Sequence, residues 1–344
     1  MLATRLRNQR LDRTPFRRPD EVVQWLGAVQ AQDYTGATWA IALRARSLTA
    51  AAIDRAFDDG RILRTHVLRP TWHFVTPADL RWMLALTGPR VRRVLASYDR
   101  TLEIDARLLG RARRIVERAL EGGRHQTREA LAGALRTEGR IEAKGQRLAH
   151  IVMHLEQAAV ICSGPRLGRQ FTYALVGERV PPAPLPSRDD ALAELARRYF
   201  QSHGPATVHD FAWWSGLTVA DARRGAATVD AGLRLEAPPA AERVGGAHFL
   251  LPNYDEYLIA YRHRGAVLDP RRSRNFGVFT SAEYPHQVVL DGRIAGSWQR
   301  TIGTREATVR LKLFARPSRE HRTALAGQAA RYGRVLGVPC RLET

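Results

Sequence analysis

The sequence predicts a mostly helical α+β fold, with three tandem winged-helix units followed by a C-terminal β-domain. Helices followed by two short apolar strands recur three times along the chain, and this is the order of a winged-helix unit. The C-terminal part breaks the order with a hairpin pattern and one long helix. We assign the units to residues 19–75, 124–175 and 204–251, within domains 1–90, 91–180, 181–255 and 256–344.

The first unit follows residues 1–18, which we expect to form a short basic helix and an arginine-containing arm. Asp59-Gly60 ends the last helix of the unit, and Arg69-Pro70 separates the two strands. We predict helices over 19–29, 36–45 and 49–57 and strands over 61–68 and 71–75.

The second unit begins at Thr127, a residue that can cap a helix, and Gly139 lies just past the end of that helix. A Gly/Pro/Arg-rich stretch separates its two strands. We predict helices over 128–137 and 144–158 and strands over 160–162 and 171–175.

The third unit carries two helix start signals, Thr207 with Asp210 and Thr218 with Asp221, on either side of the turn Ser215-Gly216. A short helix, a glycine turn and a second capped helix form a helix-turn-helix pattern. Strands over 233–236 and 247–251 are expected to close the unit as its wing.

Helical connectors are expected over 77–122 and 187–202, and the proline-rich stretch 181–186 is expected to form a stiff linker. In the C-terminal domain, the Asp291-Gly292 turn joins two strands into a β-hairpin. We predict strands over 287–290, 294–300 and 308–314 and a closing helix over 318–336.

The charge of the chain points to a polyanionic partner. Its 344 residues carry a net charge of +20, and nearly all the basic residues are arginines; the lysines are Lys144 and Lys312. Nucleic acid is the leading candidate and an anionic membrane surface the second, with affinity falling as salt rises. We see no long basic amphipathic helix and no lipidation signal to favour the membrane.

Composition also indicates a cytoplasmic protein. The two cysteines, Cys162 and Cys340, form neither a disulfide framework nor a metal site, and we expect free thiols in a reducing cytosol. No run approaches 18 apolar residues, so no transmembrane helix is expected. Residues 1–18 lack the apolar region of a signal peptide.

Gln30-Ala31-Gln32 lies between two helices of the first unit. In an extended segment, residues two apart point to the same side, so two neutral amides would face one point. An amide offers both an acceptor and a donor, so the pair could hold a water molecule and place a negative dipole beside a developing cation. The alternative is that both glutamines cap helix ends or lie in solvent, and their spacing alone favours this alternative, because two glutamines two apart are common.

Winged helices bind DNA through one helix in the major groove and through backbone contacts of the wing. Arg64, Arg69, Arg166 and Arg169 lie on or near predicted wing tips, although any single one could be an ordinary surface arginine. Four tryptophans could stack on bases or belong to the core: Trp72, Trp213, Trp214 and Trp298.

The sequence gives little support for a metal site, a paired acid–base site or a cofactor site. His66 and His73 share the first hairpin but have no third ligand at a recognisable spacing, so we expect no metal. Asp255 and Glu256 should alternate faces on a strand, which makes a paired acid–base role weak. We find no phosphate-binding loop, nucleophile elbow or dinucleotide-binding motif, and we expect no cofactor.

Six motifs follow one another along nearly the whole chain: Val29-Gln-Ala-Gln-Asp, Leu68-Arg-Pro-Thr-Trp-His-Phe-Val, Ser202-His-Gly-Pro-Ala-Thr, Asp210-Phe-Ala-Trp-Trp-Ser-Gly-Leu, Leu251-Pro-Asn-Tyr-Asp-Glu-Tyr and Asp291-Gly-Arg-Ile-Ala-Gly-Ser-Trp. In this order they resemble one family, the bacterial winged-helix DNA glycosylases of the AlkZ/YcaQ superfamily. Gln30-Ala31-Gln32 is similar to the glutamine–aliphatic–glutamine motif of the AlkZ-like branch, with the smallest aliphatic residue in the middle. The YcaQ-like branch has aspartate in the third position.

The resemblance implies a concave, C-shaped scaffold for double-stranded DNA and excision of N7-alkylguanine, including bulky or crosslinked natural-product adducts. Such an enzyme would serve alkylation repair or self-resistance. It implies catalytic roles for Gln30 and Gln32, and we expect Gln32 to orient the water and Gln30 to assist. It also implies that Trp72 and His73 line the cleft, and that Arg293 and Arg300 contact DNA beside the Asp291-Gly292 turn.

N7 alkylation makes guanine cationic, so the base leaves as a neutral group and needs no strong acid. Asp33, a possible general base next to the motif, should point away from the two glutamines.

The function class that competes with a DNA glycosylase is a winged-helix transcriptional regulator or architectural DNA binder, often a symmetric dimer on a defined operator. Three units in one chain and no coiled coil favour a monomer.

Overall fold

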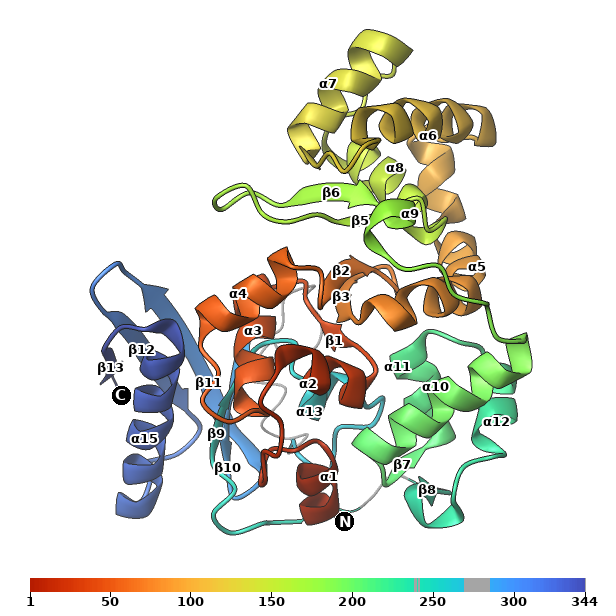
Figure 1. Cartoon of the computed structure of the whole chain (residues 1–344). Coiled ribbons are helices and arrows are strands. Elements are labelled where there is room, and N and C mark those ends of the chain that lie inside the picture. The colour runs from red at the N-terminus through yellow and green to blue at the C-terminus, as the bar shows by residue number, and fades with distance from the viewer. Residues whose placement is uncertain (238–239, 241, 269–284, 344) are drawn as a thin grey trace.

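The computed structural model describes residues 1–237, 240, 242–268 and 285–343, and it confirms an α+β fold (Figure 1). The first unit places helices around a three-stranded sheet of order β1-β3-β2. Its elements are α1 (Leu2–Asn8), α2 (Pro19–Leu26), β1 (Val29–Gln30), α3 (Tyr34–Leu43), α4 (Ala50–Asp58), β2 (Leu63–His66) and β3 (Trp72–Val75). The predicted extension of the first helix to Val29 is wrong, because Gly27 takes a φ of +81° and ends α2.

The second unit is joined to the first by two helices (Figure 1). Thr127 caps α7 by accepting the N–H of Ala130 at 3.2 Å, as its position predicts. The three-stranded sheet has the order β4-β6-β5. The elements are α5 (Pro77–Thr101), α6 (Ala106–Leu120), β4 (Gln126–Thr127), α7 (Arg128–Gly139), α8 (Gly145–Gln157), β5 (Ile161–Ser163), β6 (Thr172–Leu175) and α9 (Val176–Arg179).

The third unit has the predicted helix-turn-helix but not the predicted wing. Thr207 and Asp210 form a reciprocal cap of α11, and Gly216 takes the left-handed conformation at the turn. The wing is wrong because β8 pairs in parallel with β7, while β9 pairs with β10 of the C-terminal sheet. The elements are α10 (Arg188–His203), β7 (Ala206–Thr207), α11 (Val208–Ser215), α12 (Val219–Ala226), η1 (Ala231–Leu233) and β8 (Arg234–Leu235).

A five-stranded sheet of order β13-β12-β11-β10-β9 forms the C-terminal part, with α15 alongside it (Figure 1). The predicted hairpin, third strand and closing helix are confirmed. The last strand, which pairs in parallel with β12, was not expected from its short and charged sequence. The elements are β9 (Phe249–Leu251), α13 (Glu256–Ile259), β10 (His286–Leu290), β11 (Arg293–Ile302), β12 (Ala307–Leu313), α15 (Arg319–Leu336) and β13 (Cys340–Glu343).

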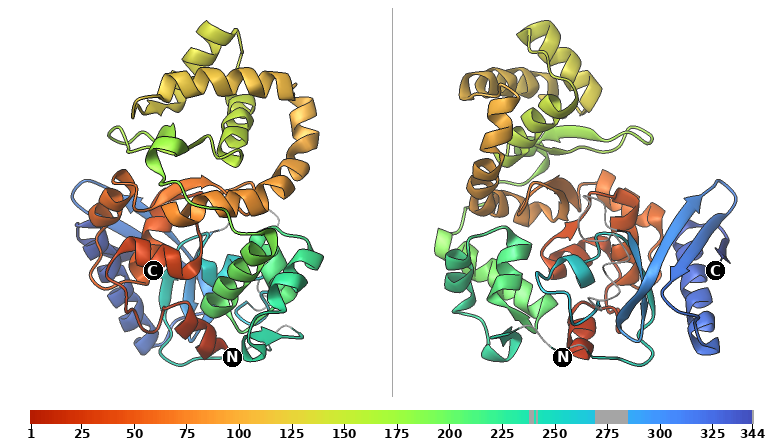
Figure 2. Two further views of the ribbon diagram at one scale, coloured as in Figure 1. Left: turned by 45° about the vertical axis from the view of Figure 1, so that its right-hand side comes forward. Right: turned by 180° about the vertical axis from the view of Figure 1, so that it is seen from behind.

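The first unit and the C-terminal sheet share one hydrophobic core. Trp39 of α3 packs edge-on against Tyr332 of α15, and its indole N–H donates to the carbonyl of Leu250 in β9 at 2.6 Å. This explains why β9 joins the distant sheet instead of a local wing. The second unit has a core of its own, and its β5–β6 hairpin packs against the first unit (Figure 2).

In the part of the chain that the structure describes, each helix falls short of the length or the apolar character that crossing a bilayer requires.

Candidate active site

The glutamine motif leaves α2 as a short extended strand. Val29 and Gln30 pair with Phe74 and His73 of β3, and the N–H of Ala31 continues the ladder by donating to Trp72 O at 2.7 Å. The extended backbone that the two-residue spacing requires is therefore present from Val29 to Ala31. Gln32 itself lies beyond the strand, in a bend.

Gln30 is the buried member of the pair, with 7% of its surface exposed. Its side-chain Oε1 accepts a hydrogen bond from Arg69 Nη2 at 2.8 Å, and its backbone N–H donates to Glu256 Oε1 at 3.3 Å. The guanidinium fixes which end of the amide is the oxygen. Gln30 is consequently an oriented amide whose carbonyl is already engaged.

Gln32 is the exposed member. Its Oε1 accepts the backbone N–H of Trp72 at 3.3 Å, a long and correspondingly weak hydrogen bond. A ligand or a water molecule can therefore reach this amide and compete for its oxygen. Of the two glutamines, Gln32 is the one that solvent contacts most freely.

Arg64 lies beneath the motif and not at a wing tip. Its Nε donates to the carbonyl of Ala31 at 3.0 Å, and its guanidinium lies 4.1 Å from the centre of the Trp72 ring and 4.7 Å from that of Phe171. Burial lowers the pKa of Arg64 to about 10, so the side chain stays charged at neutral pH. Its place in the structure is that of a support for the strand.

Trp72 and His73 differ in their exposure to solvent. The Trp72 ring is partly exposed and lies 4.4 Å from the ring of His66, which itself contacts the buried Glu156. His73 is fully buried; its Nδ1 donates to Thr71 O at 2.9 Å. Burial, and then the charge of Arg69, lower the pKa of His73 well below its ordinary value, so the ring is neutral. Direct contact of His73 with DNA would require its exposure.

The structure brings Arg300 to the motif but leaves Arg293 far from it. Arg300 bonds to Asp33, the residue after Gln32, at 2.7 Å. Arg293 lies seven positions earlier on β11, about 23 Å away along an extended strand. It stands beside the Asp291-Gly292 turn, at the opposite end of the sheet from the motif.

The two wing arginines of the second unit also differ. Arg166 makes ion pairs of 3.1 Å with Asp54 and with Asp58 on α4 of the first unit. Arg169 is exposed near the tip of the β5–β6 hairpin. Arg169 is thus open to a phosphate, while Arg166 joins two units of the protein.

Glu256 has a role that its sequence position did not reveal. It is 1% exposed, and besides Gln30 it accepts the indole N–H of Trp214 at 2.9 Å and lies 3.3 Å from His203 Nε2. Its neighbour Asp255 instead pairs with the fully buried Arg44 at 2.7 Å. The prediction that the two carboxylates lie on a strand is wrong, because Asp255 caps α13 and Glu256 begins it. Each carboxylate anchors a different element.

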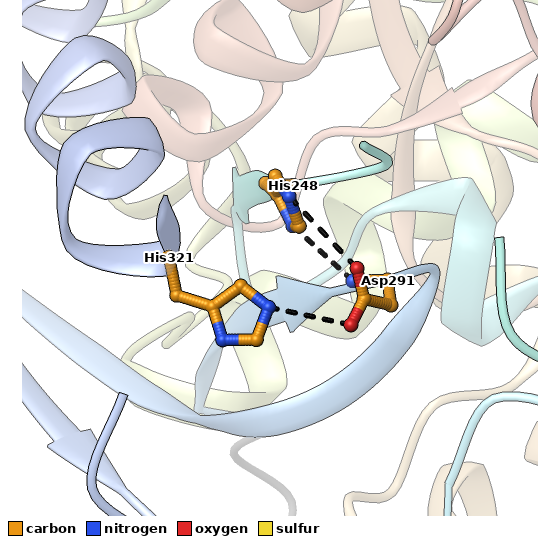
Figure 3. Close-up of side chains that lie close together, drawn as sticks. All are labelled: His248, Asp291 and His321. Atoms are coloured by element: carbon orange, nitrogen blue, oxygen red, sulfur yellow. Dashed lines mark hydrogen bonds and ion pairs between the residues drawn. The ribbon is translucent and has the colours of Figure 1, made fainter. Parts of the chain in front are cut away.

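A second cluster, His248, Asp291 and His321, joins the Asp291-Gly292 turn to α15 (Figure 3). The possible ligand atoms all lie within 4.8 Å of one another. The N–H of Asp291 donates to His248 Nδ1 at 3.2 Å, so in a neutral ring Nε2 carries the proton and has no lone pair for a metal. Arg243 also lies 3.5 Å from the carboxylate, which opposes a cation. The three side chains therefore form a hydrogen-bonded cluster that fixes the Asp291-Gly292 turn.

Comparison with known proteins identifies the family. The family model of the DNA glycosylase AlkZ-like proteins matches residues 23–335, which include the glutamine motif. An interstrand DNA cross-link repair glycosylase of Streptomyces sahachiroi is 26% identical over 332 residues, covering 87% of this chain and 86% of that protein. The solved structure of Streptomyces sahachiroi DNA glycosylase AlkZ superposes with a TM-score of 0.78 at 25% identity, over 99% of this chain and 98% of that one.

The match runs through the first unit, the helix-turn-helix and the C-terminal sheet in one order, and it favours an enzyme over a transcriptional regulator. The chain therefore belongs to the AlkZ-like DNA glycosylase family and is a DNA glycosylase.

Proposed function

We propose that this glycosylase hydrolyses the N-glycosidic bond of N7-alkylguanine in double-stranded DNA, including bulky and interstrand-crosslinked adducts. Its biological role would be base excision repair or self-resistance to a DNA-alkylating agent. The observation that carries the proposal is an exposed neutral amide, Gln32, beside an oriented one, Gln30. The relative named for cross-link repair supports the wider substrate range.

The carboxylates nearest to the motif are already engaged. Asp33 accepts hydrogen bonds from Arg300 on both oxygens, and Glu256 is buried and bonded to Gln30 and Trp214. His73 is neutral and buried. Near the motif, the described residues therefore offer no free acid. This suits a base that leaves without protonation, and N7-alkylguanine is such a base because the electron pair of the broken bond neutralises its positive charge.

The two amides have separate tasks in this proposal. Gln32 orients the attacking water and presents its carbonyl dipole to the cationic sugar of the transition state, an electrostatic effect that needs no proton transfer. Gln30 cannot present its oxygen, because Arg69 holds it, so it assists through its NH2 group and through the shape of the strand. The exposure of Gln32 leaves room for an adduct that projects from the base.

The test is base release from a duplex with a single N7-methylguanine, comparing the wild type with Gln32→Ala and Gln30→Ala. Hot alkali converts each abasic site into a strand break, and a sample without enzyme measures spontaneous depurination. We expect Gln32→Ala to lower the rate by about 10²-fold, the usual cost of one preorganised dipole, and Gln30→Ala to lower it less. DNA affinity should not change.

A parallel loss of rate and affinity would mean that the glutamines hold structure and would contradict the proposal. A duplex with an N7–N7 interstrand crosslink, assayed in the same way, tests the wider range. Release from the methylated duplex without unhooking of the crosslink would restrict the enzyme to small adducts.

A further inference from the structure

An ion pair from the C-terminal sheet holds the end of the glutamine motif. Nη2 of Arg300, on β11, donates to both carboxylate oxygens of Asp33, at 2.8 and 2.7 Å. The two side chains are only 15% and 22% exposed. Asp33 directly follows Gln32, so the contact lies one peptide unit away from the amide that we place at the reacting sugar.

The Asp33 carboxylate is fixed from a second side. Its Oδ1 also accepts the N–H of Gly36 at 3.0 Å, which makes it the N-terminal cap of α3. A Cβ at Gly36 would approach Asp33 Oδ2 to 2.8 Å, so the carboxylate lies tightly against the first turn of the helix. The backbone after Gln32 cannot turn without breaking the cap or the ion pair.

Arg300 itself stands on a rigid surface. Trp298, two positions earlier on β11, is buried, stacks on His286 with ring centres 4.6 Å apart and packs against Tyr332 at 5.5 Å. Tyr332 in turn packs against Trp39 of α3. The guanidinium is therefore carried by the core that the first unit and the C-terminal sheet share.

We propose that Arg300 is a positioning residue, which fixes the direction of Gln32 through Asp33 and does not act as a phosphate contact. This inference rests on the proposed function of Gln32. Asp33 neutralises the charge of Arg300, so a nearby phosphate would be attracted to Arg300 less strongly. Catalytic groups lose much of their effect when they shift by about 1 Å, and a strand of two residues has little pairing of its own to prevent such a shift.

The test separates catalysis from binding in Asp33→Asn, Arg300→Gln and Arg300→Lys. Asparagine caps a helix about as well as aspartate, so Asp33→Asn removes the ion pair and keeps the cap. The readouts are the single-turnover rate of N7-methylguanine release, the affinity for undamaged duplex by fluorescence anisotropy, and the melting temperature.

We expect Asp33→Asn and Arg300→Gln each to lower the rate by about 10- to 100-fold without weakening DNA binding. Arg300→Lys keeps the charge and should restore part of the rate, which a loss of folding would not allow. The double variant should be no slower than the slower single one, because both changes break one contact.

Two matched controls make the same chemical changes elsewhere. Asp105→Asn alters the cap of α6, where the side chain accepts the N–H of Leu108 at 2.7 Å, and Arg310→Gln alters an arginine of β12 that pairs with Glu343 at 2.9 Å. Both should keep the wild-type rate.

Two outcomes would overturn the positioning role alone: a wild-type rate in Arg300→Gln when Gln32→Ala is slow, or a loss of DNA affinity in Arg300→Gln that matches its loss of rate. A wild-type rate in Gln32→Ala would overturn the proposed function itself, and the positioning role with it.

Discussion

At the scale of single residues, arginines hold the glutamine motif nearly position by position. Arg69 bonds to Gln30 and Arg64 to the carbonyl of Ala31, while Arg300 bonds to Asp33. Each guanidinium offers several donors in a fixed plane, which gives a short strand more directional support than lysine could. These three arginines were predicted from the sequence as DNA contacts, and in the structure each one holds a residue of the glutamine motif in place.

His286, beside Arg300, predicts how stability depends on pH. Burial, and then the charge of Arg300, lower the pKa of His286 from 6.5 to about 4. Between these two pH values, His286 binds a proton in the unfolded chain but not in the folded protein. The free energy of unfolding is therefore highest above pH 6.5 and falls as the pH drops towards 4. The melting temperature of the wild type should therefore fall more over this range than that of His286→Gln. Identical slopes would exclude the effect.

At the scale of elements, the β5–β6 hairpin is docked onto the first unit. Phe171 packs against Tyr34 with ring centres 5.1 Å apart, and Arg166 makes its ion pairs with Asp54 and Asp58. The hairpin thus reaches the motif region although it belongs to another unit. Its tip, with Arg169, stays exposed.

The two hairpin arginines should respond differently to substitution by alanine. Arg169→Ala should weaken DNA binding and reduce the slope of affinity against salt by about one phosphate contact. Arg166→Ala should mainly lower the melting temperature, because it removes the ion pairs with Asp54 and Asp58 at the junction. Affinity titrations at several salt concentrations check the first claim. An unchanged slope in Arg169→Ala would mean that the wing does not bind a phosphate.

At the scale of the whole molecule, the N-terminal unit and the C-terminal sheet form one packed body. Their common core includes Trp39, Leu250, Trp298 and Tyr332. Arg44 of the loop after α3 crosses this body to Asp255, and both side chains are fully buried. The glutamine motif is therefore held in place by residues from both ends of the chain.

Breaking the Arg44–Asp255 pair from one side should destabilise the whole body. Arg44→Met or Asp255→Asn alone leaves a buried polar group without its partner and should cost about 3–5 kcal/mol of the free energy of unfolding. The double variant should lose less than the sum of the two, because the remaining charge is gone. Urea unfolding measures all three. Additive losses would show that the two side chains act independently.

The sequence by itself determined the local elements and the candidate motif. Caps such as Thr127 and Thr207, the Gly216 turn and the Asp291-Gly292 hairpin depend on a few neighbouring residues, so their signals are visible in one stretch. The resemblance carried by the ordered motifs gave the family.

Only the tertiary structure decided which partners those elements take. β9 leaves its own unit because Trp39 and the C-terminal sheet bury it, and Arg300, which the sequence predicts as a DNA contact, is the partner of Asp33. Glu256 becomes the anchor of Gln30 across 226 positions of the chain. Such contacts arise from the free energy of packing distant segments together. The hydrophobic periodicity within a single segment therefore does not predict them.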